Sequence, residues 1–105
     1  MVGSSLFNPG QLGQVKLENR FIRSATSETM ASENGEVTGS LQNLYRDLAK
    51  GGVGLIISGH LYVHPTGQYF HNQTGIHRDS LTKGLSNLVQ TVHGEGCKIF
   101  AQLAH

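Results

Sequence analysis

The chain has 105 residues, enough for one domain with a modest core, and a formal net charge of +1. Its Lys and Arg residues are scattered, which disfavours nucleic acid and anionic membrane surfaces as partners. The longest apolar run, 53–57, is too short to cross a bilayer, and Met1–Ser5 lacks the basic start and apolar stretch of a secretory signal.

The first third of the chain predicts a small hairpin and then a core strand. The apolar pair Leu6–Phe7 precedes a turn signal at Pro9–Gly10, and residues 15–18 alternate apolar with polar side chains. Phe21–Ala25 predicts the first core strand, whose end runs into the small and mostly hydroxylated residues Ser24–Ser27. Nothing bulky in that segment blocks the approach of a flat ligand.

Two amphipathic helices are predicted, each with one continuous apolar stripe. The first begins near Thr38 or Ser40, either of which can cap it, and ends at the Gly51–Gly52 pair. Its stripe contains Leu41, Leu44, Tyr45, Leu48 and Ala49. The second begins at Asp79 or Ser80 and ends at Gly94 and Gly96. Its stripe contains Leu81, Leu85, Leu88, Val89 and Val92.

The segment between the helices and the segment after the second helix predict two more core strands. Val53–Ile57 is apolar without alternation, which predicts burial on both faces, as in a parallel sheet. Lys98–Leu103 predicts the third strand, and we interpret Cys97 before it as a small packed residue rather than a nucleophile. Because Cys97 is the only cysteine, the chain cannot form an internal disulfide, which fits a reducing compartment such as the cytoplasm. The long polar connection Gly59–Asp79 favours a functional role.

The order strand, helix, strand, helix, strand predicts two right-handed βαβ crossovers and hence a parallel sheet. This order fits either a doubly wound sheet or part of a (β/α)₈ barrel, and both bind ligands at the carboxyl ends of their strands. The strand ends are Ser24–Ser27, Ser58–His60 and Gln102–His105. We therefore expect these segments to form one site.

Several other kinds of functional site are disfavoured by which motifs occur and where they lie in the chain. The glycines at 51–54 and 94–96 precede strands, whereas a dinucleotide-binding loop follows a strand and opens a helix. The sequence contains no Walker lysine motif and no nucleophile elbow, which disfavours a serine hydrolase. His60 and His64 follow a strand and precede Pro65, so loop polarity or ligand contact is favoured over a metal site. The dispersed acidic residues, Glu28 among them, are expected on the surface.

Gln102 stands out because it lies near the end of an otherwise apolar strand. A primary amide there must be hydrogen-bonded if it is buried. It is either a satisfied core or cap amide, or a group that recognises a planar edge carrying donors and acceptors.

The chain resembles the N-terminal part of the Old Yellow Enzyme family of FMN-dependent oxidoreductases. The matching segments cover nearly the whole chain in order: Leu6-Phe7 with Pro9, Leu17-x-Asn19-Arg20, Gly52–Ile57, Pro65-x-Gly67, and Gln102-Leu103-x-His105. The resemblance implies a (β/α)₈ TIM barrel with a lead-in hairpin, and FMN across the carboxyl ends of the strands. Residues 1–105 would be an N-terminal fragment holding the hairpin, the first three strands and two helices.

The resemblance also implies roles for individual residues. The backbone at Ser24, Ala25 and Thr26 would run along the flavin, and Ser27, the candidate catalytic residue, would hydrogen-bond near O4 and N5. Gln102 would pair with the pyrimidine edge, and a further contact would fall on Gly59–His60. Family members pass hydride from NAD(P)H through the flavin to an activated alkene or related small-molecule acceptor. Arg23 puts a charge where an apolar residue is common.

We expect the fragment alone to be inactive, because the residues that the family supplies from later strands lie beyond position 105. A three-stranded parallel piece exposes sheet edges, so we also expect the fragment to self-associate. The alternative function is a non-catalytic scaffold or assembly fragment without bound cofactor.

Overall fold

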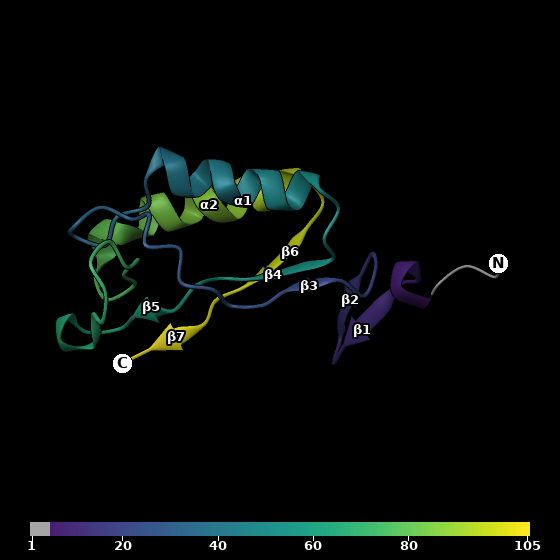
Figure 1. Cartoon of the computed structure of the whole chain (residues 1–105), viewed down its shortest axis with the longest axis horizontal. Helices are drawn as coiled ribbons and strands as arrows, with labels where there is room; N and C mark the ends of the chain where they lie inside the picture. Colours follow the sequence, from purple (N-terminus) through teal and green to yellow (C-terminus); the bar gives the residue numbers. More distant parts are fainter. Residues whose placement is uncertain (1–4) are drawn as a thin grey trace.

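A computed structural model describes residues 5–105 of the chain. A hairpin leads into a parallel sheet, and two helices lie together on one face of that sheet (Figure 1). The predicted absence of a secretory signal in Met1–Ser5 concerns residues that, apart from Ser5, lie outside the described part.

The lead-in hairpin is confirmed. A short 3-10 helix, η1 (Ser5–Phe7), precedes strand β1 (Gly10–Leu12), which pairs antiparallel with β2 (Val15–Leu17). The turn between the strands uses Gly13, whose φ of 57° lies in the left-handed region that glycine adopts at little cost.

The predicted parallel sheet is also confirmed. Its strands are β3 (Ile22–Arg23), β4 (Leu55–Ile57) and β6 (Lys98–Phe100), in the order β3-β4-β6. Leu55 and Ile56 point to opposite faces and are both 0% exposed, which explains why the apolar residues of this strand do not alternate with polar ones. The central position of β4 places its carboxyl end between those of its two neighbours.

Both predicted helices are present. Helix α1 (Gly39–Lys50) is capped by Thr38, whose Oγ1 accepts the N–H of Leu41 over 3.2 Å. Helix α2 (Thr82–Gly94) follows the 3-10 helix η3 (Asp79–Leu81), so the predicted start at Asp79 or Ser80 is the start of a tighter turn. Neither helix could cross a membrane, being too short and too polar, and no other candidate span occurs in residues 5–105.

The core lies between the helices and the sheet. It contains buried side chains from α1, β4 and α2 together with the residue that precedes β6: Leu41, Tyr45, Ala49, Ile56, Leu88, Val92 and Cys97. The interpretation of Cys97 as a packed residue is confirmed, since its Sγ lies 3.2 Å from the Val53 carbonyl oxygen. Burial raises the pKa of its thiol, which makes it a poor nucleophile.

Strand lengths were overestimated, and the prediction of one continuous strand over Lys98–Leu103 was wrong. The chain leaves β4 after Phe100 and resumes as β7 (Leu103–Ala104), which pairs with β5 (Leu61–Tyr62). Strand β5 and the 3-10 helix η2 (Pro65–Gly67) lie inside the connection predicted over Gly59–Asp79. At the break, the Ser58 hydroxyl accepts the backbone N–H of Gln102 over 3.1 Å and so replaces a ladder hydrogen bond.

Candidate functional site

The segment Ser24–Ser27 lies where the sequence predicts it, directly after the carboxyl end of β3. Ser24, Thr26 and Ser27 are exposed, and Ala25 is half-buried. The Thr26 hydroxyl donates to the Ser24 carbonyl oxygen over 3.1 Å. Exposed hydroxyl and backbone groups are therefore available along this edge.

Gln102 lies at the break between β6 and β7. Its backbone is held by Ser58, but its side chain is exposed and forms no hydrogen bond with the described residues. Of the two interpretations of Gln102, the satisfied core or cap amide is therefore wrong. The free amide fits recognition of a ligand edge.

His60 is placed differently from the other predicted site residues. It is half-buried between β4 and β5, and its ring stacks on Phe70 with centroids 5.8 Å apart. Its carbonyl oxygen accepts Nε2 of Gln73 over 3.1 Å. The His60 ring therefore packs against the connection that follows β4, and a cofactor contact by His60 stays a prediction.

The ends of β3, β4 and β6 are in direct contact. A Cβ on Gly59 would lie only 2.6 Å from the Thr26 carbonyl oxygen, so the backbone after β3 approaches β4 as closely as glycine permits. On the other side, the buried Ser58 hydroxyl donates to the Gly59 carbonyl oxygen over 2.9 Å and accepts the Gln102 N–H. These contacts hold the predicted site segments together at one edge.

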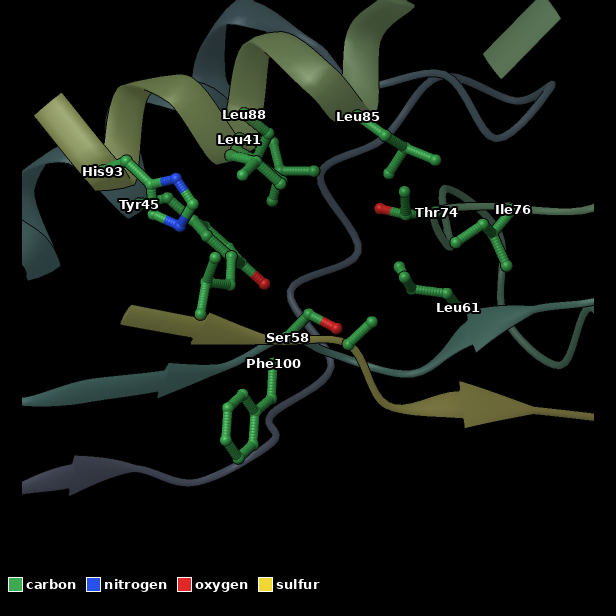
Figure 2. Close-up of a pocket in the computed structure, with 13 residues that line it drawn as sticks. Leu41, Tyr45, Ser58, Leu61, Thr74, Ile76, Leu85, Leu88, His93 and Phe100 are labelled. Atoms are coloured by element: carbon green, nitrogen blue, oxygen red, sulfur yellow. The ribbon is translucent and has the colours of Figure 1, made fainter. Parts of the chain in front are cut away.

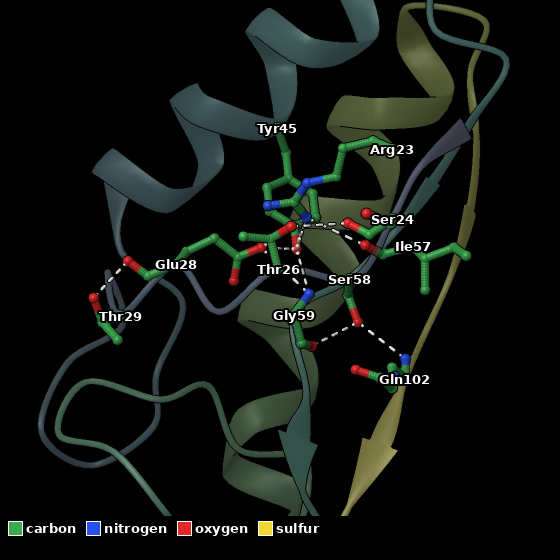
Figure 3. Close-up of polar contacts among 10 residues, drawn as sticks. All are labelled: Arg23, Ser24, Thr26, Glu28, Thr29, Tyr45, Ile57, Ser58, Gly59 and Gln102. Carbon is green, nitrogen blue, oxygen red and sulfur yellow. Dashed lines mark hydrogen bonds and ion pairs between the residues drawn. The ribbon is translucent and has the colours of Figure 1, made fainter. Parts of the chain in front are cut away.

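A largely buried ion pair lies behind this edge (Figure 3). Arg23 Nη1 donates to Glu28 Oε2 over 2.9 Å, and their side chains are only 15% and 7% exposed. The expectation that Glu28 lies on the surface was therefore wrong. Burial of the carboxylate is compensated by Arg23 and by further hydrogen bonds, as a buried charge requires.

Tyr45 of α1 completes this cluster. Its hydroxyl donates to Glu28 Oε2 over 2.6 Å and accepts the N–H of Gly59 over 3.1 Å. Burial raises the pKa of Tyr45 well above its usual range, and the hydrogen bond to Glu28 adds to this effect. The hydroxyl is therefore a fixed donor, and a proton-transfer role for it is disfavoured at neutral pH.

Sequence reasoning missed this cluster, although one signal was present. Arg23 is a charged residue in a strand predicted to be buried, and such a charge requires a partner. Glu28, five positions later, was available to provide it.

An apolar cavity of about 210 Å³ lies between the helices and the sheet (Figure 2). Its walls are mostly hydrocarbon, and the lining residues that carry polar groups are Tyr45, Ser58, Thr74 and His93. It does not include Ser24–Ser27 or Gln102. Because its lining is mostly hydrocarbon and excludes the exposed groups at the strand ends, this cavity is not the predicted site.

The exposed groups at the strand ends fit the flavin that the resemblance implies. A flavin ring carries hydrogen-bond donors and acceptors along one planar edge, and the free primary amide of Gln102 offers both. The close approach at Gly59 and the small side chains at 24–27 leave backbone and hydroxyl groups beside it. The residues present thus fit the group.

Comparison with known proteins identifies the family. The NADH:flavin oxidoreductase / NADH oxidase family matches residues 5–105. An NADH oxidase from Thermoanaerobacter brockii is 34% identical over 102 residues, and a metal reductase from Desulforamulus reducens is 39% identical over 100 residues. These alignments cover 96% and 95% of this chain but only 16% and 15% of those proteins.

A solved structure agrees with the sequence relatives. The old yellow enzyme homologue from Zymomonas mobilis superposes with a TM-score of 0.89 at 28% identity, over 97% of this chain and 28% of that one. The predicted fold, the first part of a TIM barrel, is confirmed, and so are the resemblance to Old Yellow Enzymes and the family's cofactors, FMN and NAD(P)H. The chain belongs to the NADH:flavin oxidoreductase / NADH oxidase family.

Proposed function

We propose that this chain forms part of the FMN-binding edge of an oxidoreductase that moves hydride from NAD(P)H through the flavin to an activated alkene or related acceptor. The observation that carries the proposal is the meeting of exposed polar groups from separate strands at one edge. The Thr26 backbone approaches Gly59 closely, and Ser58 joins Gly59 to Gln102. Family membership supports the same conclusion.

Each site residue has a proposed task. Ser24–Ser27 lies along the ring, and the exposed Ser27 hydroxyl donates near O4 and N5, where it stabilises negative charge on that rim. Gln102 orients the ring through its free amide, with Gly59–His60 as a neighbouring contact. The flavin supplies the hydride chemistry when bound, and the protein supplies orientation and electrostatics.

The 105-residue chain is expected to have no turnover of its own. It spans about a sixth of the length of the curated relatives, at 15% and 16%, and its site holds the ends of only three neighbouring strands. A cytoplasmic location is part of the proposal, because its one cysteine is buried and unpaired.

Titration of the purified chain with FMN tests this function. We expect saturable quenching of flavin fluorescence and a shift of the visible bands. Gln102→Ala should weaken binding about tenfold, the effect of losing a hydrogen-bonded contact. Gln90→Ala is the matched control, since Gln90 is exposed on α2, away from the site. Absence of binding, or equal weakening by both substitutions, would refute the proposal.

A scaffold or assembly role without cofactor is the second candidate, and the uncovered face of the sheet favours it. Ile22 and Phe100 are 43% and 38% exposed, and Figure 2 shows the Phe100 ring on the side of β6 away from the helices. Strands β3 and β6 are both edges of their sheet, and such edges recruit other strands. Self-association should therefore appear in light scattering. A monodisperse, cooperatively melting monomer would contradict it.

A further inference from the structure

The proposed flavin-binding segment is flanked in the sequence by two oppositely charged residues. Arg23 immediately precedes Ser24–Ser27 and Glu28 immediately follows it, and their side chains are joined over 2.9 Å. The ion pair therefore fixes the two ends of the segment relative to each other, although the segment itself is exposed. We refer to Arg23–Glu28 as the arch.

The arch is attached to two other parts of the fold through the Glu28 carboxylate (Figure 3). Oε2 accepts the Tyr45 hydroxyl of α1 over 2.6 Å and the Gly59 N–H over 3.3 Å. Arg23 adds a hydrogen bond to the Ile57 carbonyl oxygen over 3.2 Å. One carboxylate thus determines where the arch lies relative to the helix layer and the central strand.

The local backbone is adapted to this placement of Glu28. Thr29 has a φ of 52°, a conformation that a β-branched residue rarely adopts and that costs energy. A Cβ on Gly59 would lie 2.4 Å from Glu28 Oε1, so only glycine leaves room for the carboxylate. Strain directly after Glu28 and a glycine directly opposite it both favour a geometric role for the carboxylate.

Stability alone does not explain the buried pair. Apolar residues of similar volume often replace a buried ion pair without loss of stability, because desolvation offsets much of the attraction. A carboxylate with several fixed partners does, however, define one position for the chain that carries it. We propose that Glu28 is a positioning residue that holds Ser24–Ser27 in the conformation that receives the flavin. This inference rests on the proposed function, and it gives Glu28 the role of placing the segment through its protein partners.

The first test measures the arch without cofactor. In Glu28→Gln, which keeps the size of the side chain but removes its charge, backbone NMR order parameters of 24–27 should fall from about 0.85 to below about 0.6. Those of α1 should stay unchanged. Glu33→Gln is the matched control, because Glu33 is exposed in the same connection. Order parameters that stay high at 24–27, or that fall equally throughout the chain, would overturn the positioning role.

The second test is FMN titration of the same proteins. Glu28→Gln should raise the Kd about tenfold, whereas Glu33→Gln should leave it unchanged. If Glu28→Gln does not fold, Tyr45→Phe removes one anchor of the carboxylate and should change both readouts in the same direction. Equal affinity for wild type and Glu28→Gln overturns the inference. Failure of the wild type to bind FMN overturns the proposed function and the cofactor role with it, while the order parameters still decide whether Glu28 fixes the arch.

Discussion

Replacing Tyr45 with phenylalanine tests how much the buried hydroxyl contributes to stability. The variant keeps the ring in the core but removes the 2.6 Å hydrogen bond to the Glu28 carboxylate. A hydrogen bond to a charged group contributes about 1.5–3 kcal/mol. The substitution also removes the Tyr45 hydroxyl as an acceptor for the Gly59 N–H, but that N–H keeps Glu28 Oε2 as an acceptor at 3.3 Å. We therefore expect the free energy of unfolding to fall by about 2 kcal/mol.

Urea denaturation followed by circular dichroism measures this loss. For a slope of about 1–3 kcal/mol per molar urea, the midpoint should fall by about 1 M with the slope unchanged. Tyr69→Phe is the control, because Tyr69 is 82% exposed and its substitution should change stability by less than about 0.5 kcal/mol. The reasoning is refuted if Tyr45→Phe also loses less than about 0.5 kcal/mol, or if both variants lose the same amount.

Three further measurements address the pH response, the close approach at the site and the thiol. Burial raises the pKa of Tyr45 above the ordinary value of 10.0. Above about pH 10, therefore, Tyr45 ionises in the unfolded chain but not in the folded one, which favours unfolding. The stability of the wild type should then fall with rising pH more steeply than that of Tyr45→Phe. The urea midpoints of both proteins are measured between about pH 9 and pH 11, a range around the ordinary tyrosine pKa. If the two midpoints fall equally with pH, this prediction is contradicted. Gly59→Ala places a Cβ 2.4 Å from a Glu28 oxygen and should lower the free energy of unfolding by about 1–3 kcal/mol. In the control Gly94→Ala the new Cβ has nothing within 4 Å, so stability should be unchanged or higher. Equal urea midpoints for the two variants would exclude a close approach at Gly59. Because burial raises the pKa of the Cys97 thiol, iodoacetamide should label it only as the chain unfolds, and labelling of the native chain at the rate of a free thiol would show that it is accessible.

The helices and the order of the strands were predictable because their signals are local. The apolar stripe of α1, its Thr38 cap and the unbroken apolar run of β4 each depend on a few neighbouring residues. The common edge was predictable for a different reason, since parallel strands joined by right-handed crossovers bring their carboxyl ends together. On that basis Ser24–Ser27 and Gln102 were predicted at the strand ends, where they lie, and their contacts with a cofactor stay a prediction.

The polar contacts behind the site were not predictable, because they depend on how distant segments pack. Nothing in the spacing of Arg23 and Glu28 indicates that Tyr45 of α1 would donate a hydrogen bond to the carboxylate and accept one from the Gly59 N–H after β4. The break after β6 depends likewise on the Ser58 hydroxyl, which lies 44 positions before Gln102. Sequence periodicity therefore defines the elements, whereas side-chain partners far apart in the chain determine where those elements stop.

The central position of β4 also has a consequence for synthesis on the ribosome. The unit β3-α1-β4 is complete before α2 and β6 have been made, so its parallel pairing can form first. Its apolar surface is only partly covered at that stage, because Leu88, Val92 and Cys97 of the shared core arrive later. We therefore expect the half-built core of the nascent chain to be accessible to chaperones until α2 and Cys97 have been made.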